Sequence, residues 1–318
     1  KQETMQRKAA SSYAVSAFAQ AITTALITAA LVTLMVFFAL RLVPGDPIDL
    51  MLGENAAPAQ YEIFRHKLGL DAGISTQLKN FISGILHGDL GTSFTLKKPV
   101  TTLIRESFPN TALLALFAAL LANLIGIPLG ALSAWYPKSF ISKISTTFSL
   151  LVLSLPTFWL GPLLVLALCF QWPWLPVQGF ENRLAIVLPT LTLGLGMSAI
   201  IIRTTHAAVQ SCLRADYLQT ARAKGNPEWR VLFWHVLPNS AIPILMISTL
   251  QFGNLLAGAV VTEAIFDWPG IGGLAFEAIN SRDYPTIQGI VLVIALNYVI
   301  INLITEVVRK RFSPVEQV

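Results

Sequence analysis

The sequence has 318 residues, of which 54% are hydrophobic and only 12% are charged. Soluble domains carry about 25% charged residues, so this composition excludes an ordinary soluble protein and predicts an integral membrane protein. The mean hydropathy of +0.64 supports the same conclusion. The net charge of +5 is small, and because membrane topology explains it, we expect no nucleic-acid partner.

Apolar runs of about 20 residues, enough for a helix to cross about 30 Å of hydrocarbon, occur six times. They are Phe18–Leu40, Thr111–Trp135, Ser145–Phe170, Leu184–Ile202, Ala241–Thr262 and Ile287–Thr305. We therefore predict an all-α polytopic membrane protein with about six transmembrane helices. The first run is too long for a signal peptide and lacks a cleavage site, so we expect it to remain as a helix.

Basic residues predict the orientation of these helices. If the N-terminus is cytoplasmic, the only basic residues of the two short outer loops are Arg183 and Arg282. The positive-inside rule then places both termini in the cytoplasm. The predicted segments are a cytoplasmic segment 1–17, a first transmembrane helix 18–40, an extracytoplasmic helical cap 41–106, a five-helix core 107–310 and a cytoplasmic tail 311–318. The core contains a cytoplasmic loop 206–240 and an extracytoplasmic loop 263–286. The cap is predicted from amphipathic patches at Tyr61–Leu68 and Gln77–Leu86.

The polar stretch before the fifth apolar run has the signals of two helices. Asp216 and Gln219 are spaced as a capping box that starts a helix at Tyr217. Gly225 suits the left-handed residue that ends it. Asn226 then suits the cap of a second helix with Pro227 at its first position.

This helix pair has two interpretations. An ordinary loop would carry charges only to satisfy orientation. A docking element is favoured because a plain connecting loop does not need two helix starts and a glycine stop. The small residues of the stretch also leave a thin surface that fits a groove on another protein, namely Thr220, Ala221, Ala223 and Gly225. Pro238 closes the second helix or kinks it into the fifth span.

Ionisable residues are absent from the deep parts of the predicted spans, since Arg203, Glu263 and Glu306 fall near span ends. Carriers driven by ions normally need such groups, so an ion-coupled secondary transporter is disfavoured. A membrane-embedded enzyme is disfavoured as well, because no H-E-x-x-H motif occurs. The G-x-x-x-x-G-K-[ST] phosphate loop is also missing, so energy from ATP would come from a partner.

Neutral polar and small residues within the spans are candidates for the lining of a translocation pathway, because unsatisfied amides and hydroxyls in lipid are costly. These are Ser154, Pro156, Thr157, Gly194, Gly196, Ser198, Gln251, Asn254 and Gly258. Gly126 and Gly130 are instead interpreted as packing residues. In the outer loop, Trp268-Pro269-Gly270 and Gly272-Gly273 predict a tight turn followed by a short helix, Leu274–Ile279.

The cytoplasmic stretch resembles the conserved loop of permease subunits from bacterial binding-protein-dependent ABC importers. That loop reads Glu-Ala-Ala, three residues, Gly, nine residues, Ile-x-Leu-Pro. Ala221, Gly225, Leu237 and Pro238 match, while the sequence departs from the pattern at three positions. The departures are Gln219, Thr220 and His235.

Further segments are similar to the dipeptide/oligopeptide/nickel branch of this family. They are "LRLVPGDP" after the first span, "LGLD", "GDLGTSF", "SLPTFWLG", "DYLQTARAKG" and "EAIFDWPGIGGLAFEAINSRDYP". The similarity covers the chain from Leu40 onward, and the region before Ala19 matches poorly.

The resemblance implies a type I ABC importer permease fold in the bacterial inner membrane. It implies a second homologous permease subunit, two ATPase subunits that bind ATP and Mg, an extracytoplasmic solute-binding protein and membrane lipid as partners, with no catalytic residue, metal or cofactor in this chain. Di- or oligopeptides are the expected solutes, and nickel or a metal chelate is the alternative.

The resemblance also implies roles for two sets of residues. The ATPase-coupling residues would be Asp216, Tyr217, Gln219, Thr220, Ala221, Arg222, Lys224, Gly225, Asn226, Pro227, Leu237 and Pro238. The contact with the binding protein would be made by Trp268, Pro269, Gly270, Gly272 and Gly273.

Overall fold

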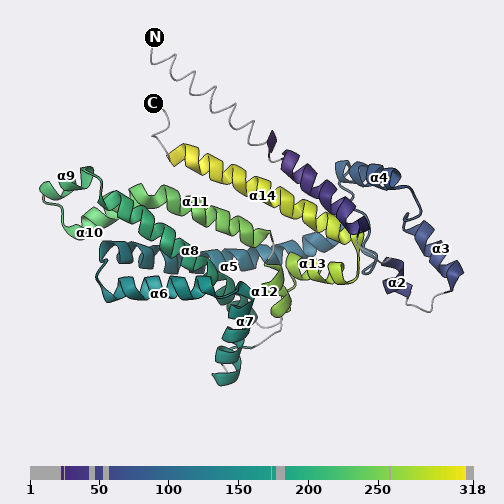
Figure 1. The fold of residues 1–318 in the computed structure, drawn as a ribbon, viewed down its shortest axis with the longest axis horizontal. Coiled ribbons are helices and arrows are strands. Elements are labelled where there is room, and N and C mark those ends of the chain that lie inside the picture. The colour runs from purple at the N-terminus through teal and green to yellow at the C-terminus, as the bar shows by residue number, and fades with distance from the viewer. Residues whose placement is uncertain are drawn as a thin grey trace, which may run out of the picture.

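The computed structural model describes residues 23–24, 26–42, 47–52, 57–172, 174–176, 183–257 and 259–312. Over these residues the regular elements are helices, and the β-type pairing is one isolated bridge between Thr92 and Pro99. The long helices lie roughly side by side in one elongated bundle (Figure 1).

Among the described residues, four helices are long and apolar enough to cross a membrane by length and composition, and a bent helix pair can count as a fifth span. They include α5 (Val100–Trp135), α8 (Val187–Leu213), α11 (Leu237–Leu256) and α14 (Tyr284–Phe312). Helices α5 and α8 pack closely. A Cβ atom at Gly126 would lie 2.6 Å from Ile201 Cγ2, and one at Gly130 would lie 2.6 Å from the Ile202 carbonyl oxygen. Both glycines are packing residues, as predicted.

The third predicted span is wrong as a single helix. Helix α6 (Phe140–Ser154) ends before Pro156, and α7 (Thr157–Val165) with the π-helical segment η1 (Leu166–Gln171) continues at an angle of 108°. Proline disfavours the helical conformation of the residue before it, and Leu155 is accordingly extended with φ −85° and ψ 133°. Helix α7 therefore points away from the other helices (Figure 1).

The fifth predicted span is also interrupted. Helix α11 ends at Leu256, and α12 (Val260–Ile265) follows after a short break in which Gly258 lies outside the described residues. Helix α13 (Ile271–Asn280) matches the predicted short outer helix but begins three residues earlier than Leu274. A 3-10 segment, η2 (Arg183–Ile186), precedes α8.

The N-terminal part of the described chain contains a helix over Leu26–Leu42 and three short helices. These are α2 (Pro47–Leu52), α3 (Pro58–Lys67) and α4 (Ile74–Leu86). Helices α3 and α4 coincide with the two amphipathic patches predicted for the cap. Helix α5 starts at Val100, within the residues assigned to that cap.

The polar loop of the sequence forms α9 (Tyr217–Ala223), α10 (Glu228–Arg230) and the π-helical segment η3 (Val231–Val236), which continues into α11. In Figure 1, α9 and α10 lie at one end of the bundle, and α2 to α4 lie at the opposite end. The two groups of short elements are thus separated by the length of the long helices.

Candidate functional site

Helix α9 begins at Tyr217 as predicted, but not through a capping box. Asp216 has helical angles, φ −63° and ψ −27°, and its side chain accepts no capping hydrogen bond. The chain leaves α8 in a tight turn, in which the Ala215 N–H donates to the Cys212 carbonyl at 3.0 Å and the Leu218 N–H donates to the Ala215 carbonyl at 3.2 Å. Backbone carbonyls therefore meet these N–H groups, and no side-chain cap is required.

Gly225 ends α9 in the left-handed conformation that the sequence predicted, with φ +77°. Its N–H donates to the Arg222 carbonyl at 2.9 Å. A Cβ atom at this position would meet nothing within 4 Å. The requirement for glycine within this chain is therefore one of backbone conformation, and the space in front of Gly225 is open.

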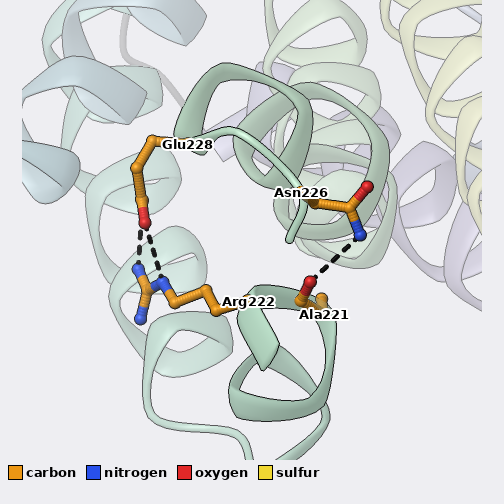
Figure 2. A network of polar contacts seen from close by, with 4 residues as sticks. All are labelled: Ala221, Arg222, Asn226 and Glu228. Carbon is orange, nitrogen blue, oxygen red and sulfur yellow. Dashed lines mark hydrogen bonds and ion pairs between the residues drawn. The ribbon is translucent and has the colours of Figure 1, made fainter. Parts of the chain in front are cut away.

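Asn226 does not cap the second helix. Its Nδ2 atom donates back to the Ala221 carbonyl oxygen at 3.0 Å, as Figure 2 shows. Pro227 is the residue before α10, with φ −65° and ψ 149°, and its carbonyl accepts the Val231 N–H at 3.1 Å. The predicted cap is wrong because the left-handed turn at Gly225 places the Asn226 side chain beside the end of α9.

An ion pair also bridges the turn between the two helices. Arg222 Nε lies 3.1 Å from Glu228 Oε1, and Arg222 Nη2 lies 3.3 Å from Glu228 Oε2 (Figure 2). Both side chains are exposed, so the pair contributes at most about 1 kcal/mol. Its two-point geometry fixes the direction of α10 relative to α9.

One face of the loop is anchored in the bundle. Leu218 and Ala221 of α9 are buried, with 1% and 6% of their surface exposed. Leu218 belongs to an apolar cluster that joins the loop to the ends of α5 and α8. The other buried members are Ala131, Ala134, Val209, Val231, Leu232 and Val236. The sequence had placed Ala221 on the thin docking surface, and the structure places it inside.

The opposite face of the loop is exposed and partly aromatic. Thr220, Ala223 and Gly225 are exposed, as the predicted docking surface requires. Sequence reasoning missed three exposed aromatic residues, which lie in α10 and η3. They are Trp229 at 57%, Phe233 at 59% and Trp234 at 70%. Large exposed apolar side chains rimmed by polar residues mark interaction sites. The sequence signal that could have revealed them is the spacing of Phe233 and Trp234, four and five residues after Trp229.

Pro238 does not close the second helix. Glu228–Leu256 is one continuous helix of 29 residues. Proline cannot donate to the carbonyl four residues earlier, which is that of Trp234, and the wider π turn over Val231–Val236 lies at this point. Such π turns are characteristic of helices that accommodate a local irregularity without ending.

The outer loop contains a second polar centre, which sequence reasoning missed. Glu263 is fully buried. Thr111 Oγ1 donates to Glu263 Oε1 at 2.8 Å, and the N–H groups of Gly272 and Gly273 donate to Oε2 at 2.7 and 3.1 Å. Burial raises the pKa of the Glu263 carboxyl, and these hydrogen bonds act against that rise. The sequence signal that could have revealed this centre is a single glutamate before a glycine-rich turn.

The glycines of this loop are needed for close approach to Glu263. A Cβ atom at Gly270 would lie 2.2 Å from Glu263 Oε2, and one at Gly272 would lie 2.6 Å from the Val260 Cα atom. Trp268 is buried as well, and its Nε1 donates to the Asn110 carbonyl at 3.1 Å. Of the five residues assigned to binding-protein contact, Pro269 is the exposed one.

Asp283 joins the segment before α5 to the start of α14. It is buried and accepts from Ser93 Oγ at 2.5 Å, from the Phe94 N–H at 3.0 Å and from Thr286 Oγ1 at 2.9 Å. The motifs "GDLGTSF" and "SRDYP" therefore meet at one carboxylate.

The predicted pathway residues differ in burial and in hydrogen-bond partners. Gly194 and Ser198 are buried within the chain, and a Cβ atom at Gly194 would lie 2.7 Å from Leu121 Cδ2, so Gly194 is a packing residue. Gln251 and Asn254 contact each other, with Asn254 Nδ2 donating to Gln251 Oε1 at 3.1 Å. Among the remaining candidates, Ser154 and Pro156 are exposed and Gly196 is half-buried. The side chain of Thr157 is not described, and Gly258 lies outside the described residues.

Comparison with known proteins relates this arrangement to a family. Residues 126–315 match the family model "Binding-protein-dependent transport system inner membrane component", and residues 15–115 match the N-terminal component of such systems. The glutathione transport system permease protein GsiC of Pectobacterium atrosepticum is 39% identical over 283 residues, which is 89% of this chain and 92% of the relative. GsiC of Escherichia coli strain K12 is 35% identical over the same share.

Solved structures show a related fold. Two structures of inward-facing conformations of the MetNI methionine ABC transporter contain a chain that superposes with TM-scores of 0.51 and 0.53 at 15% and 16% identity. The superpositions cover 65% and 66% of this chain and 97% and 96% of those chains. With a family match over most of its length, this chain belongs to the inner membrane components of binding-protein-dependent transport systems, as an ABC importer permease subunit.

Proposed function

We propose that this permease subunit forms half of a pathway for a peptide-like solute, and that a second homologous permease subunit supplies the other half. The observation that carries the proposal is the loop over α9 and α10, anchored on one face and exposed on the other. The relatives are named as glutathione permeases, which favours glutathione or a short peptide over nickel or a metal chelate.

The exposed face of the loop docks on an ATPase subunit. Thr220, Ala223 and Gly225 provide a surface with little side-chain bulk, and the exposed Trp229 and Trp234 extend it with apolar area. Aromatic residues dominate the energetics of protein interfaces. Two such ATPases bind ATP and Mg, and this chain contributes no catalytic group.

Movement of the ATPases is transmitted through the anchored face. Leu218 packs in the cluster at the ends of α5 and α8, and α10 continues into α11. A displacement of the loop therefore moves three membrane helices together. Coupling requires that the ATPase contacts differ between the inward-open and outward-open states.

The outer loop contacts the solute-binding protein through its exposed side chains. The exposed side chains include those of Pro269, Phe276, Glu277 and Ile279. Glu263 and the three glycines that surround it hold the loop in shape from within. In this orientation both termini lie in the cytoplasm of the bacterial cell, and the cap over 41–106 lies outside.

Crosslinking tests the docking role. In a background with Cys169→Ser and Cys212→Ser, an Ala223→Cys variant is coexpressed with the ATPases, and a bifunctional thiol reagent is added. We expect an adduct with an ATPase subunit whose yield changes when ATP is bound. A Glu277→Cys variant, equally exposed but in the outer loop, is the matched control and should give no such adduct. Equal yields for the two variants, or none at Ala223 in a transporting complex, would refute docking.

Uptake by the reconstituted complex tests the solute class. Proteoliposomes that contain the permease pair, the ATPases and the binding protein should accumulate labelled glutathione or a tripeptide when ATP is enclosed. Accumulation of nickel with no peptide uptake would overturn the proposed solute and leave the docking role intact.

A further inference from the structure

A cavity of about 330 Å³ lies between α5, α6 and α8 and is distinct from the docking loop and the outer centre. Its lining combines hydroxyls, two basic side chains and apolar groups: Ser133, Thr146, Ser149, Leu150, Ile202, Arg203 and His206. Acidic residues are missing from this lining, so the cavity carries positive charge without an internal counter-ion.

Hydrogen bonds fix the imidazole of His206 in this cavity. Ser133 Oγ lies 2.8 Å from the Gly130 carbonyl oxygen and 2.8 Å from His206 Nδ1. The carbonyl can only accept, so the single hydroxyl hydrogen of Ser133 is directed to it and His206 Nδ1–H donates to Ser133. His206 Nε2 then remains without a partner among the described residues.

The other polar groups of the cavity are also available. Arg203 is exposed and makes no ion pair with a described residue. The Thr146 hydroxyl has no hydrogen bond within the described chain, whereas the Ser149 hydroxyl donates to the Ser145 carbonyl at 2.7 Å. A guanidinium group and a neighbouring hydroxyl are donors suited to an oxyanion.

The position along α8 places the cavity at a membrane boundary. Arg203 lies nineteen residues after Leu184, where the candidate span begins, and at 1.5 Å per residue this is roughly 28 Å. The hydrocarbon layer is about 30 Å thick. In the proposed orientation, Arg203 and His206 therefore lie at the cytoplasmic interface. The exposed Leu150 and Leu151 of α6 continue from the cavity toward the membrane interior.

We propose that this cavity is an oxyanion-binding site at the cytoplasmic boundary, in which Arg203, Thr146 and His206 bind a phosphate or carboxylate group. Two sources present this chemistry there. One is the phosphate of an inner-leaflet phospholipid, for which basic cavities between transmembrane helices are known sites. The other is a carboxylate of the transported solute as it leaves the pathway. The inference rests on the proposed orientation and is independent of ATPase docking.

The test uses the intact complex with Arg203→Gln and His206→Gln, singly and together. Arg214→Gln is the matched control, because Arg214 is exposed at the end of the same helix but does not line the cavity. Native mass spectrometry of complexes from nanodiscs that contain phosphatidylglycerol measures retained lipid. Binding of labelled glutathione to the same complexes in zwitterionic lipid measures the solute.

If the anion is lipid, the double variant should lose retained phosphatidylglycerol about tenfold and keep glutathione binding. If the anion is the solute, the double variant should weaken glutathione binding about tenfold and retain lipid normally. Arg203→Lys should keep part of either signal, and an unchanged melting temperature shows that the fold is intact. The proposal is overturned if the double variant matches Arg214→Gln in both measurements.

Discussion

Gly225 combines a backbone requirement with an open surface. At φ +77°, a residue with a side chain costs about 1–2 kcal/mol, and a β-branched one costs more. Beyond its two neighbours, no described residue has an atom within 4 Å of a Cβ built at Gly225, so we attribute any further effect of a side chain there to a partner.

A Gly225→Val variant should therefore insert normally and lose uptake and solute-stimulated ATP hydrolysis by more than about tenfold, because strain and bulk both oppose docking. Transport in proteoliposomes and ATPase activity measure this. Gly88 offers a matched control, because it has φ +74° and a Cβ atom there would meet nothing within 4 Å. It follows α4, which lies at the end of the bundle opposite α9 (Figure 1). Gly88→Val should keep uptake within about twofold. Similar losses in both variants would mean that strain alone explains the effect.

The Glu263 carboxylate accepts hydrogen bonds from groups that the fold holds in place. Glu263→Ala removes the acceptor of the Thr111 hydroxyl hydrogen and of two glycine N–H groups, and each lost partner costs about 1–3 kcal/mol. We expect a clear fall in the melting temperature of the purified complex. Glu263→Gln keeps one acceptor for the glycine N–H groups and should lose less. Glu277→Ala, at an exposed position in the same loop, is the control and should melt as the unaltered protein does. A stable Glu263→Ala variant would contradict the assigned role.

At the scale of elements, the contact between α5 and α8 depends on missing side chains. A Cβ atom at Gly130 would lie 2.6 Å from the Ile202 carbonyl oxygen, whereas one at Gly196 in α8 would meet nothing within 4 Å. Overpacking of this kind costs about 1–3 kcal/mol. Gly130→Ala should therefore lower the melting temperature of the complex, and Gly196→Ala should leave it unchanged or raise it slightly, since alanine favours helix. A lower melting temperature for Gly196→Ala than for Gly130→Ala would show that α5 and α8 can separate without cost.

The sequence predicted those elements whose cause is local. The start of α9, the left-handed Gly225 and the short helix after Trp268 follow from propensities and backbone chemistry that neighbouring residues decide. Asn226 was misassigned because its partner, the Ala221 carbonyl, lies on the other side of a turn. The break at Pro156 was overlooked because hydropathy alone does not register a proline inside an apolar run.

The buried centres needed information that no local pattern contains. Glu263 looked like an end-of-span charge, yet it is enclosed by Thr111, which is 152 residues away along the chain. Asp283 likewise accepts from Ser93, 190 residues away. A sequence indicates that a carboxylate is present, and only the packing of α5 against α12 and α13 shows that donors surround it.

On the scale of the whole molecule, Asp283 connects residues 87–99, which lead from α4 to α5, to the N-terminal end of α14. Asp283→Asn removes the charge that three donors share and should release residues 87–99, because charge-assisted hydrogen bonds contribute about 1.5–3 kcal/mol each. Hydrogen exchange in that segment should accelerate by about tenfold or more, while exchange in α9 stays as before. Asp267→Asn, at an exposed carboxylate in the outer loop, is the control. Unchanged protection of residues 87–99 would contradict this connection.

The uninterrupted helix from Glu228 to Leu256 constrains how the transporter can move. Its inner end carries Trp229, and beyond its outer end the chain turns toward the Glu263 centre. In the proposed transport cycle, a continuous helix that tilts about its middle would move its two ends in opposite directions. Closing at the cytoplasmic end and opening at the periplasmic end would then be one movement of this helix, with no relay of signals from residue to residue.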